Sequence, residues 1–201
     1  PFGLKVPKKE SIKKYFRTIG FTNVKPLWRN ILLGIGTLLI LGFSSILLAI
    51  ILGTYTFDLS IFIRQPSLDP QVLGWFIFFI MLRPGIWEEV SFRGVILNQQ
   101  LSRYSQLFSI ILNGVLFGLF HLTNLILGAN LYFTLMQVIY ASCLGIAFAY
   151  MYVKTQSLLP CMLAHYLIDS VGQLFLNVNI PMGLNMTLFL ILGVGVIPML
   201  F

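Results

Sequence analysis

Charged side chains are scarce in this chain. They make up 9% of its 201 residues, whereas a soluble domain carries about 25%. Hydrophobic residues make up 58%. Cysteine is also rare, and Cys143 and Cys161 both fall inside apolar runs, which indicates small core residues and neither a disulfide nor a metal pair. The composition excludes an ordinary soluble domain, and no nucleic-acid partner is expected.

Long apolar runs dominate the rest of the sequence. They cover residues 30–53, 71–82, 107–128, 131–153, 157–178 and 182–201. A helix needs about 20 apolar residues to cross a bilayer, and lipid requires its backbone to be helical. The sequence therefore predicts an all-α integral membrane protein, a bundle of five to six transmembrane helices. The run 71–82 is too short alone, so it either continues past Pro84 and Gly85 as a broken helix to about Gln100 or forms a re-entrant segment.

The excess positive charge is confined to one end. Residues 1–29 carry a net charge of +7, and residues 30–201 are neutral. The positive-inside rule then predicts a cytoplasmic N-terminus ahead of a multi-pass membrane domain, 30–201. Four apolar residues of the basic segment have helical spacing: Ile12, Tyr15, Phe16 and Ile19. They predict a short amphipathic helix on anionic lipid, with a disordered basic tail as the alternative.

Few ionisable residues remain inside the apolar runs and near them. They are Glu88, Glu89, Arg93, His121, His165 and Asp169, accompanied by Asn124 and Gln173. Each would be costly against lipid, so they are expected to face one another or a wet cavity. Counted along the helices from Arg103 and Lys154, the carboxylates and histidines lie roughly 16 to 27 Å deep. The sequence therefore predicts a polar cavity near the middle of the membrane.

The adjacent carboxylates Glu88 and Glu89 are expected to have different roles. Neighbouring residues on a helix point about 100° apart, so the two are not expected to face one site. Glu89 precedes Arg93 by four residues, the favoured order for a helical ion pair, and we assign that pair to structure. Glu88 has no local cation, which suits it to accept a proton from water. Pro84 and Gly85, just before it, are expected to break the helix.

Two histidines lie on separate runs, each with a polar residue one turn later. Asn124 follows His121 and Asp169 follows His165. A lone intramembrane histidine is often only a hydrogen-bond partner between helices, Asp169 could simply orient His165, and Asn124 could cap a helix. In combination with Glu88, however, two histidines indicate hydrolysis, either by an activated water or by a metal.

Three motifs occur in order on successive hydrophobic segments. EEVSFR from Glu88 to Arg93 reads E-E-x-x-x-R, FGLFH ending at His121 and continuing to Asn124 reads F-x-x-x-H-x-x-N, and HYLID ending at Asp169 reads H-x-x-x-N/D. The ordered trio resembles the CPBP family of intramembrane proteases. That family includes the type II CAAX prenyl endopeptidases and bacterial bacteriocin-processing and immunity-type (ABI) proteins. The resemblance covers roughly residues 71–178.

The resemblance implies an intramembrane protease acting on a membrane-associated protein or peptide, including prenylated CAAX proteins, within the lipid bilayer. It implies that Glu88 is the general base that activates water and that His121 holds and polarises this water. His165 and Asp169 would stabilise the oxyanion. Glu89, Arg93 and Asn124 would support the site.

Asp169 departs from the CAAX-type pattern, in which the last motif commonly ends in Asn. An ionised aspartate cannot donate a hydrogen bond to an oxyanion. Either Asp169 is protonated, or it orients His165, which then donates. We favour the second, because a His–Asp pair one turn apart makes a charged histidine a better donor.

A zinc site is the competing chemistry. His121, His165 and Glu88 make up the His₂Glu set of catalytic zinc. The chain has no H-E-x-x-H helix, and if Glu88 bound the metal, Glu89 would be the only free base. We therefore favour glutamate catalysis that requires no cofactor, over a Zn²⁺ mechanism.

Two functions without peptide cleavage are also open. The fold could serve a non-catalytic immunity or binding protein, and the polar layer could be the proton relay of a small transporter. The chain is short and lacks the repeated halves typical of transporters, so transport is the weaker hypothesis.

Overall fold

The computed structural model describes residues 12–53, 74–172 and 183–200, and these residues form helices with no strand among them. Three segments are long and apolar enough to cross a membrane: Leu27–Ile51, Gln106–Ile126 and Leu131–Thr155. They correspond to α2 (Leu27–Ile51), α7 (Gln106–Phe120) with α8 (Thr123–Ile126), and α9 (Leu131–Thr155). The predicted all-helical membrane protein is confirmed. The expected five to six spans are not, because the described residues contain three.

The run that was too short alone continues as a broken helix, as the first of the two alternatives predicted. Its pieces are η1 (Gly74–Phe76), α4 (Ile77–Ile80), α5 (Leu82–Glu89), the π-helix η2 (Val90–Leu97) and α6 (Asn98–Leu101). The break falls at Met81, between α4 and α5. Pro84 therefore lies in the first turn of α5, where the missing N–H of proline costs no helical hydrogen bond.

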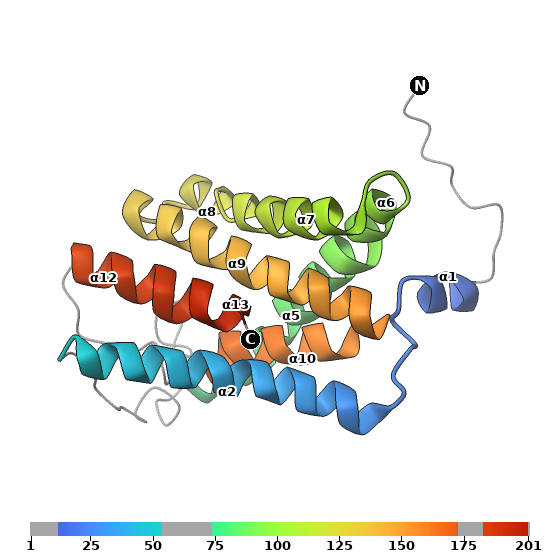
Figure 1. The fold of residues 1–201 in the computed structure, drawn as a ribbon, viewed down its shortest axis with the longest axis horizontal. Coiled ribbons are helices and arrows are strands. Elements are labelled where there is room, and N and C mark those ends of the chain that lie inside the picture. Colours follow the sequence, from blue (N-terminus) through green and yellow to red (C-terminus); the bar gives the residue numbers. More distant parts are fainter. Residues whose placement is uncertain (1–11, 54–73, 173–182, 201) are drawn as a thin grey trace.

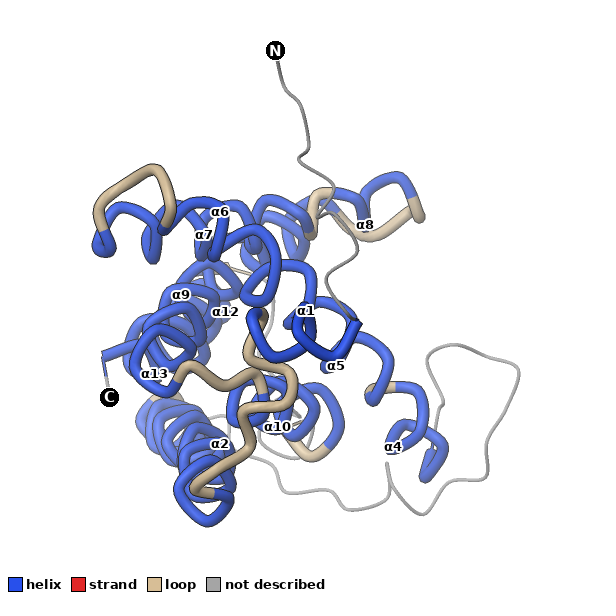
Figure 2. The backbone as a smooth tube through the Cα atoms, turned by 90° about the vertical axis from the view of Figure 1, so that its right-hand side faces the viewer, coloured by secondary structure: helices blue, strands red, loops and turns tan. Residues whose placement is uncertain are grey.

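The remaining helices complete one bundle (Figure 1). They are α10 (Leu159–Ser170), α12 (Leu184–Leu188), the π-helix η3 (Phe189–Val196) and α13 (Ile197–Leu200). α9 packs against α7 on one side and η3 on the other, and α10 packs against α2, α5 and α9. Viewed from the end of the bundle, α10 lies between α2 and α5 (Figure 2). This places the helix that carries His165 beside the one that carries the glutamates.

The tightest contact between helices is that of α7 with α9. A Cβ atom added to Gly114 would meet Ile146, and one added to Gly118 would meet Ser142. Gly145 of α9 in turn lies against the backbone of Gly114. Small residues let helices approach closely in lipid, and these three glycines allow the close contact of α7 with α9.

The basic segment contains a helix, α1 (Ile12–Thr18). Ile12, Tyr15 and Phe16 are exposed on it, whereas Ile19 is buried just after its end. Ile12 is thus largely uncovered and Tyr15 and Phe16 are partly exposed, which leaves this face of α1 available to a membrane surface. Residues 1–11 lie outside the described part of the chain, and the cytoplasmic orientation stays a prediction.

Candidate active site

His165 is the centre of a buried cluster of carboxylates. Its Nδ1 lies 2.8 Å from Oε1 of Glu89, and its Nε2 lies 3.3 Å from Oδ2 of Asp169 and 3.8 Å from Oε2 of Glu88. The helices come this close because Gly85 of α5 has no side chain: a Cβ there would lie 3.1 Å from the backbone nitrogen of Tyr166. One imidazole therefore contacts three carboxylates from two helices.

The expectation that Glu88 and Glu89 do not face one site is wrong. The two side chains leave the helix in different directions, but an imidazole has its nitrogens on separate edges of the ring. His165 lies between them and presents Nδ1 to Glu89 and Nε2 to Glu88.

The ion pair of Glu89 with Arg93 is present as the spacing indicates. Nη1 of Arg93 lies 3.0 Å from Oε1 of Glu89, and both side chains are completely buried. Nη2 of Arg93 donates to the carbonyl oxygen of Gly145 at 3.1 Å, and the guanidinium lies 4.3 Å from the ring centre of Phe117. Arg93 thus joins η2 to α7 and α9 and neutralises Glu89, which agrees with a structural role.

Glu88 differs from Glu89 in its exposure and in its charged partners. Oε2 of each glutamate is buried and has no hydrogen-bond partner among the described residues, but Arg93 pairs with Oε1 of Glu89. The side chain of Glu88 is 15% exposed, whereas that of Glu89 is fully buried. Glu88 is therefore the glutamate of the pair that is partly exposed and that Arg93 does not neutralise.

His121 ends α7 and lies beside this cluster without bonding to it. Its Nδ1 is 3.0 Å from the carbonyl oxygen of Phe117, and because a carbonyl only accepts, Nδ1 is the donor. The Phe117 ring stands edge-on to both His121 and His165, with centroids 5.2 and 5.7 Å apart. In the part of the chain that the structure describes, no hydrogen bond or ion pair joins His121 to Glu88. Phe117 separates the two histidines.

Asn124 lies farther along, where it joins two helices. Its Nδ2 donates to Oε1 of Gln137 at 2.9 Å, which ties α8 to α9. The side chain therefore supports the packing of the helix pair instead of capping a helix end. Gln173, the remaining member of the polar set, lies outside the described residues.

Sequence reasoning missed two polar residues that support the site. One is Gln137, the partner of Asn124. The other is Asn113, fully buried on α7, whose Nδ2 donates to the carbonyl oxygen of Phe92 in η2 at 2.9 Å. Both stand as isolated amides inside apolar runs, and that isolation is the signal that could have found them.

The residues of the zinc alternative do not fit a metal in this arrangement. Among the described residues, no group of three or more His, Cys, Asp or Glu side chains could hold a metal ion. Both ring nitrogens of His165 face carboxylate oxygens, so a metal bound at Nε2 would have to replace its contact with Asp169. The set of His121, His165 and Glu88 is thus brought near one place without forming a metal site.

Two pockets lie elsewhere on the described structure. The first, of about 680 Å³, is lined by α2, α7, α9 and α13, and the second, of about 660 Å³, lies on α5 and the start of η2 beside Arg83 and Trp87. Neither is lined by Glu88, His121, His165 or Asp169. The polar cavity expected around the site is therefore not one of these two pockets.

Comparisons with known proteins bear on the family. Neither the curated proteins nor the solved structures contain a match to this chain. The family described as type II CAAX prenyl endopeptidase Rce1-like matches residues 70–171, just over half of the chain, and this range holds the three motifs and the whole cluster around His165. The chain belongs to the type II CAAX prenyl endopeptidase Rce1-like family of membrane proteases.

Proposed function

We propose that this protein is an intramembrane endopeptidase that hydrolyses a peptide bond of a membrane-associated protein or peptide, with Glu88 as the general base. The observation that carries the proposal is the different surroundings of the two glutamates. Glu89 is completely buried and is neutralised by Arg93, whereas Glu88 is 15% exposed and its charged contact is Nε2 of His165, 3.8 Å from an Oε2 atom that has no hydrogen-bond partner among the described residues. A carboxylate with a free acceptor atom in a desolvated place is suited to take a proton from water.

The proposed reaction consumes one water molecule. Glu88 removes a proton while the water oxygen attacks the carbonyl carbon of the substrate, and the carbonyl becomes an oxyanion. Glu88 then delivers the proton to the leaving amine as the carbon–nitrogen bond breaks. With Nδ1 of His121 donating to Phe117, Nε2 of the neutral ring is an acceptor that can hold the same water.

His165 is the proposed donor to the oxyanion. Both of its nitrogens face carboxylates, so both carry hydrogen and the ring is a cation in this arrangement. The contact with Glu89 at 2.8 Å is shorter than that with Asp169 at 3.3 Å. We propose that Glu89 holds the ring through Nδ1. The Nε2–H group then donates to the oxyanion instead of to Asp169.

The substrate is proposed to reach the site from the membrane. Family membership supports a membrane-associated substrate, and prenylated CAAX proteins are the class that the family name suggests. The basic segment ahead of α2 supports a cytoplasmic N-terminus, which would place Arg103 and Lys154 on the cytoplasmic side.

The test is cleavage of a quenched fluorescent peptide library that includes farnesylated CAAX peptides, by protein purified in detergent. Wild type is compared with Glu88→Gln and with wild type in a strong chelator. The proposal predicts cleavage that is lost in Glu88→Gln and kept in chelator. Loss in chelator would instead favour zinc, and full activity of Glu88→Gln would refute the assignment of the base.

A second candidate is a non-catalytic binding or immunity protein of the same fold. The observation that favours it is the lack of any bond between His121 and Glu88, together with two pockets that exclude the site. This candidate predicts that Glu88→Ala and His121→Ala leave partner binding or protection intact.

A further inference from the structure

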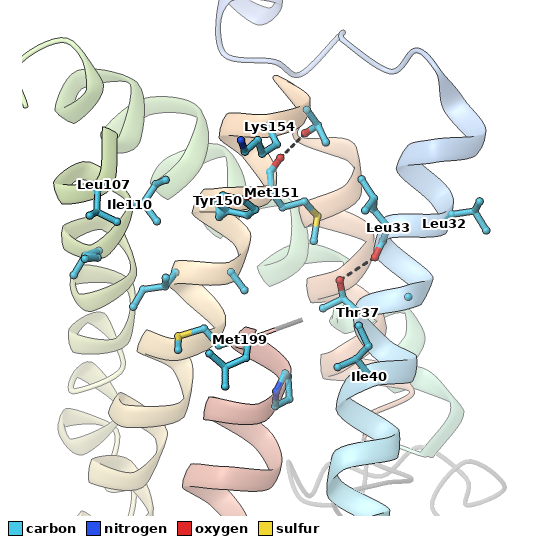
Figure 3. Close-up of a pocket in the computed structure, with 17 residues that line it drawn as sticks. Leu32, Leu33, Thr37, Ile40, Leu107, Ile110, Tyr150, Met151, Lys154 and Met199 are labelled. Carbon is cyan, nitrogen blue, oxygen red and sulfur yellow. Dashed lines mark hydrogen bonds between the residues drawn. The ribbon is translucent and has the colours of Figure 1, made fainter. Parts of the chain in front are cut away.

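A deep apolar groove lies on the side of α9 away from the His165 cluster. Its volume of about 680 Å³ lies within the range of sites for small molecules. The groove is lined by residues of α2, α7, α9 and α13 (Figure 3). Its floor is buried, as at Ile110, whereas its rims are exposed, as at Leu32 and Leu107. It is therefore open toward lipid.

The wall of the groove is apolar because its hydroxyl groups are satisfied internally. Thr37 donates to the carbonyl oxygen of Leu33 at 2.9 Å, and Thr155 donates to that of Met151 at 2.8 Å, the two bonds drawn in Figure 3. These hydroxyls have no hydrogen left for a ligand. A gap of this kind in hydrocarbon gains dispersion contacts when an aliphatic chain fills it.

One end of the groove is charged. Lys154 lies there in the last turn of α9, exposed, with its Nζ 5.3 Å from the ring centre of Tyr150. Among the residues that line the groove, Lys154 is the charged one. Arg29 stands one turn before Leu32 and Leu33 on α2, so a second cation lies toward the same end.

The length of the groove matches one leaflet. From Lys154 to Ile146 on α9 is eight residues, about 12 Å, and Leu32 to Ile40 on α2 spans the same length. This is less than half of the roughly 30 Å hydrocarbon core. A molecule with aliphatic chains about one leaflet long and an anionic head group meets both the apolar wall and the charged end.

We infer that this groove binds one anionic phospholipid of the bilayer, with its acyl chains along α2 and α9 and its phosphate at Lys154. Basic pockets between membrane helices attract anionic head groups in this way. The site is separate from Glu88 and His165, and the inference does not rest on the proposed protease activity.

Native mass spectrometry of the purified protein in detergent tests it. The protein is mixed with equal amounts of phosphatidylglycerol and phosphatidylcholine that have the same acyl chains, and the retained lipids are counted. Wild type is expected to keep one phosphatidylglycerol. Lys154→Gln is expected to lower the preference for it about fivefold, the effect of one cation near a membrane surface.

Gly36 offers a way to fill the groove without disturbing the fold. It lines the groove, and a Cβ added there has nothing within 4 Å, so Gly36→Phe and the smaller Gly36→Leu are expected to fold and to lose both lipids. Arg103→Gln and Leu39→Phe are the matched controls, since both residues are exposed and neither lines the groove.

Three outcomes overturn the inference. They are an unchanged preference in Lys154→Gln, lipid retention in Gly36→Leu equal to that of wild type, and displacement of phosphatidylglycerol from the groove by a farnesylated peptide. The last would assign the groove to substrate. Glu88→Gln is expected to bind lipid as wild type does, which separates this result from the test of the protease.

Discussion

The Nδ1 atom of His165 lies 2.8 Å from Oε1 of Glu89, the same oxygen that Nη1 of Arg93 contacts at 3.0 Å. One carboxylate oxygen thus receives hydrogen bonds from two cationic groups on separate helices. This arrangement fixes the His165 ring, while its other nitrogen faces Asp169 and Glu88. Glu89 and Arg93 therefore hold the ring, whereas the groups proposed to take part in the reaction lie at its other nitrogen.

Removing Arg93 leaves a buried, unpaired carboxylate. We expect Arg93→Leu to lower the free energy of unfolding by about 3–5 kcal/mol, the cost of breaking a buried ion pair. Thermal unfolding in detergent measures it. The double variant Glu89→Gln with Arg93→Leu is the control, since it removes both charges and is expected to recover part of the loss. An unfolding temperature of Arg93→Leu equal to that of wild type would contradict the buried pair.

Enlarging Gly118 is expected to push α7 away from α9. A Cβ there meets Ser142 and the backbone of Val138, so Gly118→Ala is expected to cost about 1–3 kcal/mol by overpacking. Gly36→Ala on α2 is the matched control, because its Cβ has open space and alanine favours a helix by roughly 0.5–1 kcal/mol. The same unfolding measurement applies. Equal unfolding temperatures for the two variants would argue against the close contact of the helices.

Asp169 is expected to act through His165. Replacing its carboxylate with an amide is the change that tests this role. An Asn side chain still offers an oxygen to Nε2 of His165, whereas Ala offers none. We expect Asp169→Asn to keep kcat/KM within about tenfold and Asp169→Ala to lose about 10–100-fold, the value of a hydrogen bond to a charged group. Equal losses in both variants would show that the negative charge itself is required.

The hydrogen bond between His121 and the Phe117 carbonyl gives a further prediction. Because Nδ1 of His121 donates to the Phe117 carbonyl, Nε2 is the atom left for water. His121→Gln is expected to retain a weak activity and His121→Ala to lose about 10²–10⁴-fold in kcat, the range for a group that assists proton transfer. Steady-state kinetics measure both, with unfolding temperatures as the control for folding. Full activity of His121→Ala would remove His121 from the site.

The sequence predicts the local features of the site well. Spacing alone indicates the Glu89–Arg93 pair, because i and i+4 are neighbours on any helix. Likewise, the sequence offers two forms for the run that begins at residue 71, and one of them is the broken helix that the structure has.

Long-range geometry is where sequence reasoning fails. Nothing in the order of residues says that the His165 ring lies between Glu88 and Glu89, because that depends on how α10 packs on α5 at Gly85. The number of spans stays unconfirmed, since three helices of the described residues are long and apolar enough to cross a membrane and an apolar run indicates burial of any kind, in lipid or in protein.

The most direct test of the account compares Glu88→Gln with Glu89→Gln in two measurements, kcat/KM for a cleaved peptide and the unfolding temperature. The account predicts a crossed result: Glu88→Gln unfolds as wild type does but is inactive, whereas Glu89→Gln unfolds at a lower temperature because Arg93 loses its charged partner. Activity of Glu88→Gln equal to that of wild type, or loss of stability in Glu88→Gln alone, would contradict the division of the two glutamates into a reacting and a structural one.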